Sequence, residues 1–264
     1  MWENALFNIP PFACLKSFLD EKAALYNTPN FIESDPISIP HRFSKKEDIE
    51  IAGFLSATIA WGNRKSIVTS ANRMMQLMDE SPFEFVMNHS ASDIKRAKGF
   101  VHRTFNAEDF CQFIKSLRYI YSEKDGLENV LTALMKKQSN PQQAISSFKK
   151  IFFEKKHLIR TQKHVSDPMS GSSAKRINMY LRWMVRSDKR GVDFGLWKDI
   201  KPSQLSIPLD VHTGNIARKL GILHRTQYDW KAVEELDMVL RSFDANDPVK
   251  YDFALFGLGA IEKF

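Results

Sequence analysis

The sequence predicts an almost entirely α-helical protein. Apolar residues recur at intervals of three and four along much of the chain, which is the spacing of one buried helix face. Residues that cap helices precede many of these stretches. Alternating strand patterns are scarce, and the clearest one covers only residues 192–196. Short, numerous, capped helices favour a compact helical array over a long coiled coil.

The expected helices follow in order along the chain. The first presents one apolar face, made by Phe12, Leu15, Phe18, Leu19 and Ala23. Ser44 and Glu47 have the spacing of a capping box, which predicts an apolar helix from there to residue 59. Capping residues mark further starts at Ser81, Asn106, Asn140, Asp229 and Asp247. The charged segment 186–191 is expected to be an exposed loop, either a solvated connector or a loop that faces DNA.

The composition is that of a soluble globular protein with a basic charge balance. The 264 residues suffice for one large domain or two small lobes. Lys and Arg number 38 against 31 Asp and Glu, a balance that suits nucleic acid but is also found in proteins that are merely soluble and basic. No apolar run approaches the roughly 20 residues that span a bilayer, and no signal-peptide pattern opens the chain. Because Cys14 and Cys111 are too few for a disulfide framework, we expect a cytoplasmic protein.

A lysine opens one of the predicted helices. It ends the run Gly171-Ser172-Ser173-Ala174-Lys175, in which either serine is expected to cap a helix that continues through Met184. Positive potential at a helix N-terminus and partial burial both disfavour an ammonium group, so Lys175 can supply a neutral amine nucleophile. The alternative is an ordinary solvated lysine.

An aspartate opens another predicted helix, 35 residues later in the chain. Asp210 lies between Leu209 and Val211 and precedes a helix expected to reach Leu220. A carboxylate at this position is most often a simple N-cap, but it can also stabilise positive charge that develops on a substrate. The connection from Lys175 is long enough for both groups to face one cleft, since the intervening helix rises only about 18 Å.

These two segments resemble parts of the helix-hairpin-helix DNA glycosylases. The resemblance covers Pro208-Leu209-Asp210-Val211-His212 and the following Ile-Ala-Arg at 216–218, and it is closest to the 8-oxoguanine branches, including the archaeal one. The run at 171–175 is similar to that family's hairpin, whose lysine attacks C1′ of the damaged nucleotide. Ser173 stands where the hairpin has its second glycine. The whole chain also resembles a conserved bacterial family of uncharacterised activity.

The resemblance implies an all-α, two-lobed fold with the active site in the cleft between the lobes. Residues 45–186 would form a helical barrel lobe that ends in the hairpin, and 1–44 with 187–264 would form the second lobe. It also implies a monomeric base-excision repair enzyme that removes an oxidised base from damaged duplex DNA, with 8-oxoguanine as the expected lesion. Lys175 would form a Schiff base that permits strand cleavage, and Asp210 would stabilise the oxocarbenium-like charge.

Further residues gain expected roles in DNA binding from the same resemblance. Asn63 or Arg64 would fill the gap left by an extruded base, and Phe256 would line the base pocket, although a solvated turn and core packing are the respective alternatives. The residues expected to bind DNA are His102, Arg103, Gly171, Ser172, Ser173 and His212, with surface capping as the alternative for His102 and Arg103. No cofactor and no side-chain metal site are expected, whereas backbone carbonyls of the hairpin can hold a monovalent cation.

Two other functions fit the same sequence. One is a DNA-binding relative that keeps the fold without catalysis, and the other is a helical protein-interaction scaffold. Borohydride trapping separates the enzyme from the first, and a steep dependence of DNA affinity on salt separates both from the second.

Overall fold

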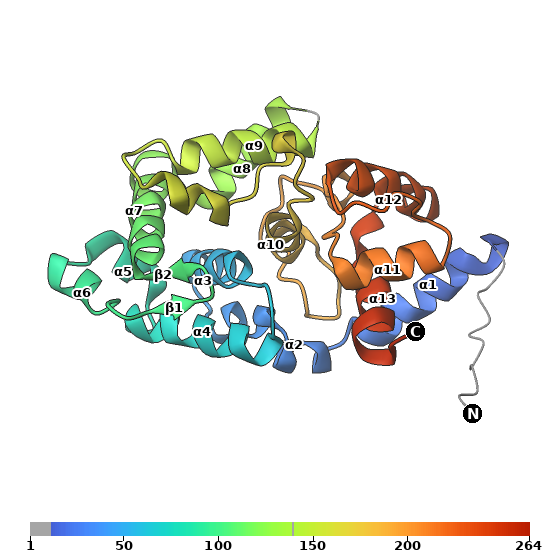
Figure 1. The fold of residues 1–264 in the computed structure, drawn as a ribbon, viewed down its shortest axis with the longest axis horizontal. Coiled ribbons are helices and arrows are strands. Elements are labelled where there is room, and N and C mark those ends of the chain that lie inside the picture. The colour runs from blue at the N-terminus through green and yellow to red at the C-terminus, as the bar shows by residue number, and fades with distance from the viewer. Residues whose placement is uncertain (1–11, 139) are drawn as a thin grey trace.

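The computed structural model describes residues 12–138 and 140–264, and helices form most of this chain (Figure 1). The prediction of an all-α protein is therefore confirmed. Within the described residues, the strands are limited to β1 (Val101–His102) and β2 (Phe105–Asn106), which pair antiparallel in a short hairpin.

The α-helices are α1 (Phe12–Tyr26), α2 (Asn30–Ser34), α3 (Lys46–Thr58), α4 (Arg64–Leu77), α5 (Pro82–Asn88), α6 (Ala91–Lys95), α7 (Ala107–Glu123), α8 (Gly126–Lys137), α9 (Pro141–Phe152), α10 (Lys175–Val185), α11 (Val211–Lys219), α12 (Trp230–Phe243) and α13 (Tyr251–Gly257). Short 3-10 segments are η1 (Pro36–Ser38), η2 (Pro40–Arg42), η3 (Ile159–His164), η4 (Pro168–Ser170), η5 (Pro202–Gln204) and η6 (Pro248–Lys250). A π-helical turn, η7 (Leu258–Glu262), follows α13.

Most predicted helix starts are found where the capping residue stands. Asn106 forms a full capping box with Asp109 at the start of α7, and Asn140 and Asp229 cap α9 and α12. The prediction at Ser44 was wrong, because α3 begins at Lys46 without a side-chain cap. Tertiary contacts hold its first turn instead: Lys46 binds Glu128, and the Asp48 carboxylate accepts the Phe83 amide at 2.8 Å. Asp247 opens only the short segment η6.

The apolar face of α1 is also shorter than predicted. Leu15, Leu19 and Ala23 are buried, whereas Phe12 is 65% exposed. The ring of Phe12 contacts the ring of Phe243, with the two centroids 6.1 Å apart. The buried part of α1 packs against α13.

The predicted strand at 192–196 is absent. This segment bonds to the end of a helix and not to another strand: the amides of Phe194 and Trp197 donate to the carbonyls of Trp183 and Met184 in α10. The terminal carbonyls of a helix lack partners within the helix, so an adjoining segment can satisfy them.

Helix α10 lies between two groups of helices, α3 to α9 and α1 with α11 to α13 (Figure 1). All its residues from Ile177 onward are buried. It packs directly on α3, and Gly53 permits this approach, since a Cβ there would lie 3.2 Å from Met184 Cε and 3.4 Å from Tyr180 Cε2. Aromatic rings of α3, α7, α9 and α10 fill the core on this side.

A buried network of charges joins α10 to its other neighbours. Arg182 pairs with Asp193 and Asp252, and Arg186 pairs with Asp193 and Asp247. The expectation that segment 186–191 is an exposed loop was therefore wrong at its first residue, because Arg186 is only 4% exposed. Its three carboxylate partners, Asp188 among them, compensate the burial of its charge. Across residues 12–138 and 140–264, no helix is both long and apolar enough to cross a membrane.

Candidate functional site

A pocket of about 670 Å³ lies where the N-terminal ends of α10 and α11 meet. Residues from α2, from the connection between α3 and α4, and from α13 complete its walls. A volume of this size is typical of pockets that enclose a small molecule. The predicted site residues that line it are Arg64, Ser172, Ser173, Lys175, Asp210, His212 and Phe256.

Lys175 is the first residue of α10, but the cap before it differs from the prediction. The N-cap position is Ala174, a buried residue held in the left-handed region with φ +49°, and it makes no side-chain cap bond. Ser172 accepts the Ala174 amide with its Oγ at 3.1 Å, so it forms a turn before the helix. Ser173 Oγ donates to the Leu209 carbonyl at 3.3 Å. The two serines therefore shape the chain that delivers Lys175 and do not cap its helix.

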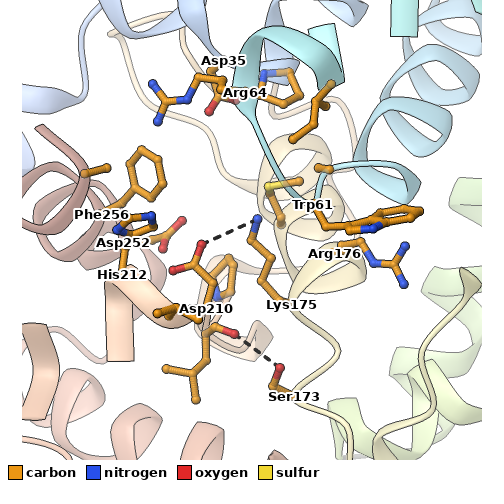
Figure 2. A pocket seen from close by; sticks show the side chains of 18 of the residues that line it. Asp35, Trp61, Arg64, Ser173, Lys175, Arg176, Asp210, His212, Asp252 and Phe256 are labelled. Atoms are coloured by element: carbon orange, nitrogen blue, oxygen red, sulfur yellow. Dashed lines mark hydrogen bonds and ion pairs between the residues drawn. The ribbon is translucent and has the colours of Figure 1, made fainter. Parts of the chain in front are cut away.

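Asp210 is the N-cap of α11, and its two oxygens have separate partners. Oδ1 accepts the Thr213 amide at 3.0 Å, which is the capping bond expected of an aspartate at this position. Oδ2 lies 3.7 Å from Lys175 Nζ (Figure 2). Both side chains remain partly open to solvent, with exposed fractions of 25% for Lys175 and 22% for Asp210. An amine and a carboxylate thus face each other inside the pocket.

Hydrogen bonds join the segment before α10 to the starts of both α11 and α12. Besides the Ser173 bond to Leu209, Ser172 forms an isolated β-bridge with Asp229, and the Gly171 carbonyl accepts the Trp230 amide at 3.2 Å. Gly171 has φ +91°, a conformation that glycine adopts without strain, and its side-chain position is open space. These bonds fix the distance between the N-termini of α10 and α11, and with it the Lys175–Asp210 approach.

Aromatic rings form one wall of the pocket. The ring of Phe256 contacts Phe31 edge to face at 6.0 Å and His212 at 6.1 Å, measured between centroids. The Arg64 guanidinium carbon lies 5.0 Å from the centroid of the Phe256 ring, within the range of a cation–π contact. Figure 2 shows His212 and Phe256 on one side of the Lys175–Asp210 pair and Trp61 with Arg176 on the other.

Two buried carboxyl groups of the pocket were not predicted. Asp252, on α13, binds Arg182, and its Oδ1 lies 3.5 Å from Thr213 Oγ1; burial raises the pKa of Asp252 to about 6. Asp35 accepts the Ile37 amide at 3.1 Å, and burial raises its pKa as well. Asp252 stands four residues before Phe256, on the same helix face, and this spacing is the sequence signal that could have identified it.

Four other predicted residues do not line the pocket: Gly171, which precedes the two serines, and Asn63, His102 and Arg103. Asn63 is exposed and caps α4, where its Oδ1 accepts the Ser66 amide at 3.1 Å. His102 is buried in the β1–β2 hairpin with Nδ1 2.9 Å from Ser70 Oγ, and burial lowers its pKa. Arg103 is exposed with φ +55°, and its Nη1 would lie 2.8 Å from a Cβ at Gly62. Arg103 thus reaches the edge of the pocket at Gly62, whereas Asn63 and His102 do not reach the pocket.

The chemistry available in this pocket is that of an amine next to a carboxylate. In the part of the chain that the structure describes, no three His, Cys, Asp or Glu side chains are grouped so that they could hold a metal ion. The expected monovalent cation at the hairpin stays a prediction. Lys175 can act as a nucleophile, and Asp210 can accept its proton or stabilise an adjacent positive charge.

Searches of curated proteins and of solved structures gave no match to this chain. A protein-family model does match it, over residues 35–261. This range includes Lys175, Asp210 and every other residue of the pocket except Phe31. The chain therefore belongs to the family described as "Protein of unknown function (DUF2400)".

Proposed function

We propose that the protein is a DNA repair glycosylase with AP lyase activity that removes an oxidised base, with 8-oxoguanine as the expected lesion. The observation that carries this proposal is the 3.7 Å distance between Lys175 Nζ and Asp210 Oδ2, at the N-termini of two helices that line one pocket. The resemblance of the two segments to the helix-hairpin-helix glycosylases supports it, and so does the formal charge of +7.

The proposed reaction begins with proton transfer from the Lys175 ammonium to Asp210. The free amine attacks C1′ of the damaged nucleotide, and the C1′–N glycosidic bond breaks with its electron pair going to the base, which takes up the proton that Asp210 received. Asp210 is thereby a carboxylate again, and it stabilises the positive charge that develops at C1′ and O4′. A proton of the amine adduct then passes to O4′ as the sugar ring opens at the C1′–O4′ bond, which leaves a protonated Schiff base and a free 4′-hydroxyl.

Strand cleavage follows from this Schiff base. The iminium acidifies C2′–H, so loss of that proton expels the 3′ phosphate by β-elimination. Water then hydrolyses the imine and releases Lys175 for another turnover. The base must leave the duplex for any of these steps, at a cost of a few kcal/mol for unstacking.

On this proposal, DNA binds across the cleft between two lobes, with residues 45–186 as the barrel lobe. The pocket volume of about 670 Å³ suits an extruded nucleotide, and Phe256 would stack against its base. Arg64 and His212 reach the same pocket and would contact the flanking phosphates together with the amides at the N-terminus of α11.

Borohydride trapping on duplex DNA that contains 8-oxoguanine or an abasic site tests the proposal. The reagent reduces the Schiff base to a stable secondary amine, so the wild type should form a covalent protein–DNA adduct. Lys175→Ala should form none while it still binds the duplex. Lys115→Ala, at an exposed lysine on α7, is the matched control and should be trapped like the wild type. An adduct of undiminished yield with Lys175→Ala would refute the assignment.

A second candidate is a DNA-binding protein of the same fold without catalysis. The observation that favours it is that Lys175 and Asp210 already satisfy each other as an ion pair. Salt-sensitive DNA binding without a trapped adduct on a broad panel of lesions would select this candidate. Negligible DNA affinity at moderate salt would instead favour the protein-interaction scaffold.

A further inference from the structure

Arg176 is a cation in the pocket wall that the proposed chemistry does not use. It is the second residue of α10, and its guanidinium carbon lies 4.7 Å from the centroid of the Trp61 ring. Its Nη1 donates to the carbonyl of Thr58 at the end of α3. A guanidinium has five N–H donors, so most of its donors are left for another group.

The charge of Arg176 has no carboxylate partner among residues 12–138 and 140–264. Arg176 is partly buried, whereas Arg182 of the same helix and Arg186, the residue that follows the helix, are buried, and each of these two pairs with at least two aspartates. Burial lowers the pKa of Arg176 to about 10, which leaves it charged at neutral pH. A partly buried charge without a counter-ion is costly, so the contrast with Arg182 and Arg186 needs an explanation.

The surroundings of Arg176 add positive potential. It lies in the first turn of α10, where the helix dipole disfavours a cation; there, Asp210 compensates Lys175 but not Arg176. His164 stacks on Trp61 at 6.0 Å, and burial lowers its pKa to about 4, so it is neutral. The bond to Thr58 requires only a donor, which a neutral side chain could provide. The retained charge therefore indicates a ligand that is itself negative.

We propose that Arg176 and Trp61 form a phosphate-binding subsite in the wall of the pocket. A guanidinium binds two phosphate oxygens at once, and the indole face holds it in a fixed orientation. Arg103, which packs on Gly62 next to Trp61, adds a second cation from the rim. If the proposed function holds, the ligand is a phosphodiester of the strand that carries the extruded nucleotide; the same chemistry would also bind a free phosphate.

Two binding measurements test the subsite and distinguish these sources. One measures the affinity for a duplex with a tetrahydrofuran abasic analogue over a series of salt concentrations, since this analogue cannot form a Schiff base and reports binding alone. The other measures the affinity for inorganic phosphate against chloride at equal ionic strength. Arg176→Gln is compared with Arg118→Gln, which removes the same charge from an exposed position on α7.

We expect Arg176→Gln to weaken duplex binding about tenfold and to reduce the slope of log affinity against log salt by about 0.9, the value for one lost phosphate contact. Arg118→Gln should leave both quantities unchanged. A loss confined to inorganic phosphate would support the subsite and identify free phosphate as its ligand. If Arg176→Gln matches Arg118→Gln in both measurements, or if the wild type binds neither ligand, the subsite is refuted.

Two more variants keep the test informative if Arg176→Gln does not fold. Arg176→Lys keeps the charge and should retain the salt slope while it loses affinity for inorganic phosphate. Arg103→Gln changes an exposed side chain and should reduce the salt slope by a similar amount, about 0.9; unchanged values for both variants would refute the subsite. Trapping yields measured on the same proteins separate this outcome from failure of the proposed function, because a protein that binds phosphate at Arg176 without forming an adduct would refute only the enzyme.

Discussion

In the proposed mechanism Asp210 caps α11 and also stabilises positive charge, and Asp210→Asn separates these two roles. The capping bond to the Thr213 amide needs an oxygen and no charge, so asparagine should keep it. The interaction with Lys175 needs the negative charge. The variant should therefore remain as stable as the wild type while base release slows. Asp210→Ala loses both the capping bond and the negative charge, so it should also lower the free energy of unfolding by about 1 kcal/mol.

The distance between Lys175 Nζ and Asp210 Oδ2 sets the expected size of the effect of Asp210→Asn on catalysis. Two unit charges 3.7 Å apart interact by about 4 kcal/mol at an effective dielectric constant of about 20. The positive charge that forms on the sugar during bond cleavage lies next to Lys175 Nζ, so a similar energy applies to it. Loss of this energy in the transition state slows the reaction about a thousandfold.

Single-turnover base release from 8-oxoguanine duplex, with enzyme in excess, measures this step without product release. The abasic-analogue affinity of the variant serves as the control for DNA binding. An unchanged single-turnover rate for Asp210→Asn, with unchanged stability, would reduce Asp210 to a helix cap and refute the reasoning.

Three further predictions concern stability. Gly257→Ala should lower the free energy of unfolding by about 1 to 3 kcal/mol in urea titrations, because its Cβ would lie 2.1 Å from Tyr26 Cδ2; an unchanged midpoint would show that α1 and α13 can separate freely. Asp193→Ala leaves two buried arginines short of a partner and should cost about 3 to 5 kcal/mol, with a matching fall in melting temperature; a loss below 1 kcal/mol would contradict the role of the network. His164→Gln should flatten the pH dependence of stability: the lowered pKa of about 4 means that the wild type has its full His164 contribution above pH 6.5 and loses about 3 kcal/mol as the pH falls toward 4. Parallel curves of unfolding free energy against pH for the wild type and His164→Gln would contradict this role of His164.

The helix starts were predictable where the determining interaction is local. Asn106, Asn140, Asp210 and Asp229 each bond to an amide two or three residues ahead, so the sequence alone contains both partners. Ser44 has the same spacing, but contacts with α5 and α8 set the start of α3. A sequence pattern does not contain those partners.

The candidate site was predictable in part. Lys175 and Asp210 stand in runs with a recognisable order, and the structure brings them together in one pocket. Asp252 was missed because it lies inside the apolar run of α13, which reads as core. The significance of Arg176 depends on the absence of a nearby carboxylate, which only the folded arrangement reveals. His102 lies buried because two strands form where the sequence predicts none.

In the proposed mechanism, Lys175 forms a covalent bond with C1′ of a damaged nucleotide. Peptide mapping by mass spectrometry of the borohydride-trapped adduct tests it most directly, since it identifies the modified residue without any mutation. We expect a reduced sugar fragment on the peptide that contains Lys175, at its Nζ. A fragment on a different lysine, or the absence of any adduct with both 8-oxoguanine and abasic duplexes, would contradict it.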